Sequence, residues 1–377
     1  MSQKLVLIGG GHAHAIALRQ WGLSPLSDVD LTLISDVEQT PYSGMLPGLV
    51  AGFYNYHETH IDLRSLARFA GAEFICDRAN GIDPDNNQII CTSGQLTFDY
   101  LSLDIGSIPQ TLTIPGAKEY IIPAKPVPVF LDAWYKLNHL AAAHPEQPLS
   151  IAIVGGGAGG VELALNMQTC LKAILNGKSI PEMHLIHRGK QLLPGHNNWV
   201  SNKLTKIIQQ RGIKLHLQQD VTEVLAEQII CQSGLKIAAS NIFWVTQATA
   251  PSWIKESHLK TDAHGFILVA DTLQSISHPH IFAAGDIATM VNYQRPKAGV
   301  FAVRQGQPLF NNWQNILTQQ PLQSYTPQDK YLALIGTGDQ KAIASWDSLG
   351  WRSALFWRLK DYIDRKFMNQ FVNLNIQ

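Results

Sequence analysis

The chain has 377 residues, and its 29 lysines and arginines balance its 29 aspartates and glutamates, so the formal net charge is zero. This balance gives no basic surface for nucleic acid, and 45% apolar residues argue against extensive disorder. The length predicts two or three domains. The four scattered cysteines form no C-x-x-C pair, which predicts a reducing, cytoplasmic location. We expect neither a signal peptide nor a membrane span, because the apolar runs are short or interrupted by glycine and glutamate.

A strand, a run of three glycines and a helical pattern occur twice, starting at residues 5–8 and 151–154. Each copy returns through a second strand, at residues 30–35 and 183–187. Hairpins around Ser93-Gly94 and Ser233-Gly234, followed by strands at 100–105 and 243–246, extend the duplication. The sequence therefore predicts an α/β fold with two Rossmann-like, three-layer dinucleotide-binding domains.

The second domain is predicted to be inserted in the first. An apolar run at residues 280–284 lies where a returning chain would place a closing strand of the first domain. We expect the first domain at 1–118 and 251–320, the second at 119–250, and a small α+β unit at 321–377. A proline-rich crossover is expected at 121–128, a hairpin at 331–336 and 341–346, and a helix at 351–371.

The glycine loops carry the clearest chemical signal. Gly155, Gly157 and Gly160 have the G-x-G-x-x-G spacing, which lets a pyrophosphate approach the N–H groups at the start of a helix. The first loop has Gly9 and Gly11, but His14 takes the third position and must be accommodated between helix and strand. His12 and His14 lack the partners of a metal site, so no metal is expected.

The ends of the second strands indicate the coenzymes. Ser35-Asp36 suits the ribose hydroxyls of an unphosphorylated adenosine, whereas His187-Arg188 suits a 2′-phosphate. The sequence thus favours NADPH over NADH at the second site. A surface arginine without such a role is the alternative.

Three further segments carry a family resemblance. Residues 97–107, which include Asp104 and Gly106, residues 243–248, and residues 281–286, which end in Gly285-Asp286, resemble motifs of the two-dinucleotide-binding-domain flavoproteins, the pyridine nucleotide-disulfide oxidoreductase superfamily. Asp104 departs from the small residue usual there. The resemblance implies FAD in the first domain and NAD(P)H in the second, with Asp286 hydrogen-bonded to the flavin ribityl chain.

The cysteines narrow this resemblance. Without a closely spaced pair, thiol-disulfide chemistry is excluded, and no cysteine follows Cys231, so sulfide:quinone oxidoreductases fit poorly. The type II NAD(P)H dehydrogenase branch remains. Residues 9–14 and 40–52 look more narrowly like a subfamily found fused to selenophosphate synthase.

The resemblance also implies roles for single residues. Pro41, Ser43, Gly44 and Met45 would pass along the isoalloxazine, and Glu162 would lie near the contact of nicotinamide and flavin. A solvated carboxylate at a helix start is the alternative for Glu162. Lys297 and Ala298 would begin a helix that points at the flavin pyrimidine ring, while Gln305 and Lys341 would lie near a quinone.

The helix expected at 351–371 combines aromatic and basic residues, as membrane-surface helices do. Because the two kinds interleave around the helix, a dimer or core-packing helix is the alternative to peripheral membrane docking.

Together these observations predict an FAD-dependent enzyme that passes hydride from NAD(P)H to flavin N5 and then electrons to a quinone-type acceptor. The alternatives are a soluble NAD(P)H diaphorase with another acceptor, and a flavin-based redox sensor that acts through a partner. The expected location is cytoplasmic, at most peripheral on a membrane.

Overall fold

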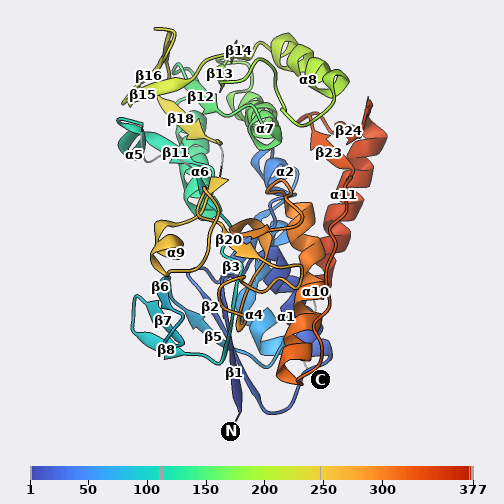
Figure 1. Ribbon diagram of the computed structural model, residues 1–377. Helices are drawn as coiled ribbons and strands as arrows, with labels where there is room; N and C mark the ends of the chain where they lie inside the picture. Colours follow the sequence, from blue (N-terminus) through green and yellow to red (C-terminus); the bar gives the residue numbers. More distant parts are fainter. Residues whose placement is uncertain (1, 110–113, 247, 373, 375–377) are drawn as a thin grey trace.

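The computed structural model describes residues 2–109, 114–246, 248–372 and 374. Two five-stranded parallel sheets lie one above the other in Figure 1, and helix α11 runs down one side of the molecule. The predicted α/β fold with two Rossmann-like domains is confirmed.

The first sheet has the strand order β21-β9-β1-β2-β5. Its strands are β1 (Gln3–Ile8), β2 (Val29–Ser35), β5 (Glu73–Cys76), β9 (Tyr100–Leu103) and β21 (Ile281–Ala283). Helices α1 (His12–Leu23), α4 (Leu63–Phe69) and α10 (Gly299–Leu317) belong to this domain. As expected, residues 281–283 close the sheet against β9, so the chain returns to its first domain.

The second sheet has the equivalent order β11-β18-β12-β13-β14. Its strands are β11 (Ile121–Pro123), β12 (Ser150–Val154), β13 (Glu182–His187), β14 (Lys214–Leu217) and β18 (Asn241–Trp244), with helices α6 (Val127–Ala143), α7 (Ala158–Leu175) and α8 (Asn198–Gln210). The expectation that residues 121–123 are only a crossover is wrong. They form an edge strand, where Pro123 is tolerated because an edge strand needs fewer ladder hydrogen bonds.

Each domain carries a three-stranded antiparallel sheet. The first is β6 (Ala79–Asp83), β7 (Gln88–Cys91) and β8 (Gln95–Thr97); the second is β15 (Val221–Leu225), β16 (Gln228–Cys231) and β17 (Lys236–Ala238). Both predicted hairpins are present. The remaining strand of each sheet, β6 or β15, was not predicted, and each of these strands has a register shift near its start. Strand β6 escaped prediction because Asn, Gly and Asp are rare in strands.

Short elements join these units. They are β3 (Gln39–Pro41), α2 (Leu46–Val50), α3 (Tyr56–Thr59), β4 (His60–Asp62), β10 (Ile108–Pro109), α5 (Ala117–Tyr120), β19 (Ala248–Thr249), α9 (Ser252–Glu256), β20 (Ile267–Val269), the 3-10 turn η1 (Gly285–Ile287) and β22 (Ala288–Met290). Strands β10 and β19 pair where the chain leaves and re-enters the first domain, so the two crossings form one ribbon.

The C-terminal unit contains β23 (Ala333–Gly336), β24 (Ala342–Trp346), β25 (Leu349–Ser353), α11 (Ala354–Met368) and the 3-10 turn η2 (Asn369–Phe371). The predicted hairpin is present, but the helix does not begin at Trp351. Residues 349–353 pair with β24, and the Ser353 hydroxyl caps the helix by accepting the Phe356 N–H at 3.2 Å.

Helices α1 and α10 pack against each other, and both begin beside the first glycine loop. Helices α1 and α10 cross at Gly306, where a β-carbon would lie 2.6 Å from Cβ of Ile16. Helix α2 of the first domain and the β23–β24 hairpin of the C-terminal unit share one hydrophobic core with α7 of the second domain. Helix α2, which follows residues 41–45 in the chain, is thereby held against α7.

Candidate dinucleotide and electron-transfer site

The first glycine loop accommodates its histidine without losing the helix start. Gly11 is the N-cap of α1, and Gly9 has a φ of 91°, which disfavours any side chain. The buried His14 ring donates from Nδ1 to the Gly9 carbonyl (2.7 Å) and accepts at Nε2 from the Ser102 hydroxyl (2.8 Å). Burial lowers the pKa of His14 to about 4, so this ring is neutral and braces the loop.

The segment predicted to follow the flavin meets the ends of both helices. The His12 ring lies 3.3 Å from the Pro41 carbonyl and edge-on to Tyr42. Burial lowers the pKa of His12, which keeps this ring neutral as well. Beside it, a β-carbon on Gly299 at the start of α10 would lie 3.2 Å from the Ser43 hydroxyl oxygen, and Met45 is fully buried.

The end of β2 carries an ion pair that the sequence did not predict. The exposed Asp36 carboxylate accepts hydrogen bonds at 2.9 and 3.1 Å from the Arg78 guanidinium. Ser35 is buried and its hydroxyl accepts the Val37 N–H at 3.3 Å. Asp36 thus stands at the strand end where a ribose would bind, with its orientation set by Arg78.

Asp286 has an unpredicted cationic partner. Its carboxylate accepts from Lys125 Nζ at 2.7 Å and from the Ser107 hydroxyl at 3.3 Å. Burial opposes ionisation, yet the pKa of Asp286 is lowered because Lys125 lies so close. Lys125 lies in the second domain, between β11 and α6, and no sequence motif indicates its contact with Asp286. Gly106, beside Ser107, has no atom within 4 Å of its missing β-carbon, so this corner is open.

The residues at the start of α10 face inward. Ala298 is the N-cap of the helix. Lys297 Nζ donates to the Ala288 carbonyl (2.5 Å) and the Thr289 hydroxyl (3.0 Å), and burial lowers the pKa of Lys297 to about 8. The buried Gln305 amide oxygen accepts the Gly285 N–H at 2.7 Å, so Gln305 orients the turn that carries Asp286. All these residues except Ala288 and Thr289 were predicted as site residues. Lys297 and Gln305 both form hydrogen bonds within the protein.

The second glycine loop has the geometry of a phosphate cradle. A β-carbon on Gly160 would lie 1.9 Å from the Gly155 carbonyl oxygen, so only glycine allows this close turn. Gly157, the N-cap of α7, has no atom within 4 Å of its missing β-carbon, which leaves room for a ligand. His187 Nδ1 accepts the Gly156 N–H at 3.2 Å, and Arg188 is exposed at the end of β13.

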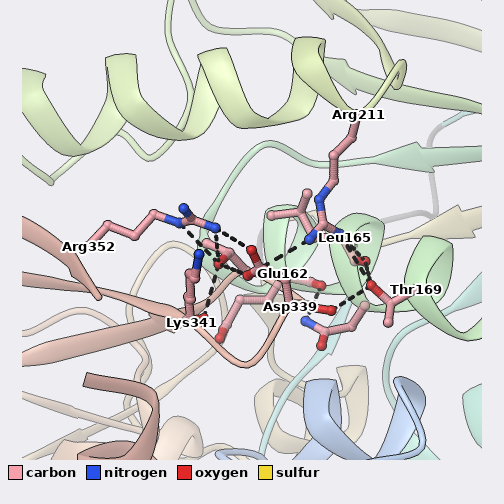
Figure 2. Close-up of polar contacts among 10 residues, drawn as sticks. Glu162, Leu165, Thr169, Arg211, Asp339, Lys341 and Arg352 are labelled. Carbon is pink, nitrogen blue, oxygen red and sulfur yellow. Dashed lines mark hydrogen bonds and ion pairs between the residues drawn. The ribbon is translucent and has the colours of Figure 1, made fainter. Parts of the chain in front are cut away.

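Glu162 lies where the second domain, the hairpin and α11 meet. Its Oε1 accepts the Gly336 N–H at 2.7 Å (Figure 2). Burial raises the pKa of Glu162 to about 7, while the Lys360 charge and the Gly336 hydrogen bond oppose this rise. The carboxyl is therefore no solvated helix-start group, since it is engaged and can hold a proton near neutral pH.

Lys360 connects this carboxyl to the predicted flavin segment. The lysine is buried, and its Nζ donates to the Gly44 carbonyl at 2.5 Å and to Asp364 at 2.6 Å. No sequence pattern distinguishes Lys360, because it stands among exposed basic residues of the same helix. The spacing of Lys360 and Asp364 predicts an i, i+4 ion pair, but the sequence does not predict that this pair is buried.

The hairpin tip is clamped to α7 by polar contacts that Figure 2 shows. The Asp339 carboxylate accepts from Arg352 at 2.5 Å and lies 3.8 Å from the Arg211 guanidinium. The Thr169 hydroxyl donates to the Gly338 carbonyl at 2.7 Å. Lys341 is exposed, and its carbonyl accepts the Thr337 N–H at 2.9 Å. The clamp holds Gly336 against Glu162.

Both loops fit a dinucleotide, because a helix starts at each of them, and open space lies at Gly157 in the second loop and at Gly106 near the first. The residues of the first loop and Asp286 would hold FAD, and those of the second loop would hold NAD(P)H. The four cysteines are unpaired thiols on β5, β7, α7 and β16, so they provide no redox-active disulfide. No helix among the described residues is long and apolar enough to cross a membrane.

Sequence relatives point the same way at low identity. A probable NADH dehydrogenase of Dictyostelium discoideum is 23% identical, with 95% of this chain and 86% of the relative aligned. The NADH dehydrogenase-like protein YutJ of Bacillus subtilis is 23% identical over 90% of this chain and 91% of its own. A type II NADH:quinone oxidoreductase of Staphylococcus saprophyticus is 19% identical over 97% and 94%. These names do not mention selenophosphate synthase, so that narrower resemblance stays a prediction.

Solved structures share the fold. NDH2 of Plasmodium falciparum in complex with NADH superposes with a TM-score of 0.82 at 18% identity, over 99% of this chain and 98% of that one. The sulfide:quinone oxidoreductase of Aquifex aeolicus gives 0.81 at 21% identity, over 100% and 92%. The family model of the pyridine nucleotide-disulphide oxidoreductases matches residues 3–306. With both glycine loops in place on this fold, the chain belongs to the pyridine nucleotide-disulphide oxidoreductase family and is an oxidoreductase similar to NADH dehydrogenases.

Proposed function

We propose that the protein is an FAD-dependent NAD(P)H dehydrogenase that passes electrons to a quinone-type acceptor. The observation that carries this proposal is the junction at Lys360, which links the flavin segment at Gly44 to the region of Glu162 beside the second glycine loop. When bound, FAD would accept hydride from NAD(P)H and give electrons to the acceptor. The chain's own residues bind and orient the two nucleotides, stabilise the charge that develops on reduction, and hold protons.

The proposed proton-holding group is Glu162. Quinone reduction consumes protons, and a carboxyl with a pKa near 7 can hold and release one at neutral pH. Lys360 places a positive charge between this carboxyl and the flavin segment, where negative charge develops on reduction. The hairpin N–H of Gly336 keeps the carboxylate in one orientation. Lys297 and Lys341 stay proposals for charge stabilisation and for quinone contact, and Gln305 acts by orienting the Asp286 turn.

The acceptor is proposed from the relatives named type II NADH:quinone oxidoreductases and from an exposed apolar surface on the C-terminal unit. We define the C-terminal apolar face by its exposed large side chains, which are Trp346, Leu349, Trp351, Leu355, Leu359, Tyr362 and Ile363. Lys360 and Asp364 pair inside, while Arg352 and Arg365 form ion pairs, so the exposed face is more apolar than the sequence suggests. We propose peripheral contact with the cytoplasmic face of a membrane rather than a homodimer, because basic Arg358 and Lys366 accompany this face.

For the coenzyme, Arg188 supports NADPH. It is exposed at the end of β13, at the position where the first domain has Asp36. The relatives are named for NADH, so the preference is a proposal that Arg188 alone supports.

Anaerobic addition of NADPH, or of NADH, to the purified protein should bleach its visible flavin band, and a quinone should restore it. Reduction without reoxidation by quinone, but with turnover of other acceptors, would favour the diaphorase. A flavin that neither donor reduces would contradict the dehydrogenase and favour the redox sensor. Absence of flavin after reconstitution with FAD would contradict the whole proposal.

Replacing Glu162 by glutamine should change how stability depends on pH. A carboxyl with a raised pKa binds its proton more tightly in the folded state, so its cost of ionisation is absent below about pH 4.5 and complete above about pH 7. Wild-type protein should therefore lose up to about 3 kcal/mol of unfolding free energy relative to Glu162→Gln between these values. Urea unfolding at pH 5 and pH 8 measures this, with exposed Glu227→Gln as control. A pH-independent difference would refute the assigned state of Glu162.

Arg188→Glu should reverse the coenzyme preference. The substitution removes an attraction for the 2′-phosphate and adds a repulsion, so the ratio of kcat/KM for NADPH over NADH should fall at least about tenfold. Steady-state kinetics with both donors measures the ratio. Lys236→Glu, which changes an exposed side chain on β17 of the same domain, is the control and should leave the ratio unchanged. If the Arg188 variant keeps the wild-type ratio, the arginine has no role in coenzyme choice.

The triple variant Leu349→Ser, Trp351→Ser, Leu355→Ser should bind lipid vesicles at least about tenfold more weakly than wild type, because it removes apolar area from the C-terminal apolar face. Co-flotation with vesicles that contain anionic lipid measures binding. A matched control is the double variant Leu140→Ser, Ile180→Ser, whose side chains are also exposed, at 61% and 84%. Unchanged vesicle binding with a reduced molecular mass in solution would instead show that the face forms a dimer.

A further inference from the structure

Asp104 is a buried carboxyl group at the start of helix α1. One of its oxygens accepts hydrogen bonds from the N–H groups of Ala13 (2.8 Å) and His14 (3.1 Å), and the residue is 2% exposed. A β-carbon on Gly11 or on Gly285 would lie 2.2 or 2.3 Å from the carboxyl group. The carboxyl therefore fills the narrow space between the glycine loop and the turn that carries Asp286.

The second domain provides an internal comparison. The Asp104 N–H donates to the carbonyl at the end of β1, and the Val245 N–H donates in the same way to the end of β12. The missing β-carbons of Gly9 and Gly155 face the carbonyl oxygens of these two residues. Asp104 and Val245 are thus equivalent positions of the duplicated fold. One loop has a carboxyl group under its helix start where the other has an apolar side chain.

This difference matters for a phosphate ligand. The free N–H groups in the first turn of a helix are the donors that bind phosphates in dinucleotide folds. In α1 a carboxyl group already uses two of them, and when ionised it cancels the positive end of the helix dipole. Phosphate groups brought to this helix start would meet that negative charge.

We propose that Asp104 couples flavin binding to proton uptake, so that the first glycine loop binds FAD with the Asp104 carboxyl protonated and loses affinity as the pH rises. The proposal rests on the assignment of FAD to this loop in the proposed function. Asp104 would then be a positioning residue that determines the affinity for flavin, and a bound flavin would be released more readily at alkaline pH.

The surrounding charges agree with this coupling. Burial raises the pKa of Asp104 to about 7, the Ala13 and His14 N–H groups oppose the rise, and the Asp286 carboxylate adds to it. On α1, the rings of His12 and His14 are neutral, since burial lowers the pKa of both. Lys125 is paired with Asp286. No cation among these groups neutralises Asp104 directly, and bound phosphates would raise its pKa further.

The test is the dissociation constant of FAD for flavin-free protein between pH 5.5 and 8.5, measured by quenching of flavin fluorescence. For wild type, the constant should be flat at low pH and rise by up to about tenfold per pH unit above about pH 7, as one linked proton requires. Asp104→Asn should bind FAD with little pH dependence and at least about tenfold more tightly than wild type at pH 8.5. Asp30→Asn, which removes an exposed carboxylate of β2, is the control and should follow wild type.

A second measurement needs no variant. Calorimetric titration of wild type with FAD at pH 8, in two buffers with different ionisation enthalpies, should show uptake of about one proton per flavin. FAD binding with no proton uptake and a flat pH profile would overturn the role of Asp104 and leave the proposed function intact. Weaker binding by a folded Asp104→Asn variant at pH 8.5 would also overturn it. Failure to bind FAD at any pH would overturn both.

Discussion

The buried ammonium group of Lys360 is the contact on which the arrangement of the site depends. A charge removed from water is costly unless it is paired and hydrogen-bonded, so its partners must be held in place. Those partners come from distant parts of the chain, because Gly44 precedes α2 and Asp364 lies on α11. The charge of Lys360 also lowers the pKa of Glu162 on α7, against the larger effect of burial. One lysine thereby ties the C-terminal helix to both dinucleotide-binding domains.

The clamp at the hairpin tip serves the same junction from the other side. Asp339 between two arginines and the contact of Thr169 with Gly338 fasten the hairpin to α7. The Gly336 N–H is then available to Glu162 in a fixed position. This fixed position matters because the pKa of a buried carboxyl depends on the number of its hydrogen-bond and charge partners and on their distances.

The two domains have the same topology but differ in the chemistry of equivalent positions. His14, Asp36 and Asp104 of the first correspond to Gly160, Arg188 and Val245 of the second. The first loop thus contacts a neutral histidine and a buried carboxyl group. The second loop has open space at Gly157 and the apolar side chain of Val245 in place of that carboxyl group. A duplicated fold can in this way hold two different nucleotides without changing its strand order.

The sequence by itself determined the two Rossmann-like units, their glycine loops and the insertion of the second domain, because strand-glycine-helix patterns are local and occur twice. It also placed Glu162 at a helix start and Asp286 after a closing strand. The partners of these residues, Lys125, Gly336 and Lys360, were decided only by the tertiary structure. Each lies far from its partner along the chain, and no local pattern distinguishes a lysine that becomes buried and paired from one that stays in water.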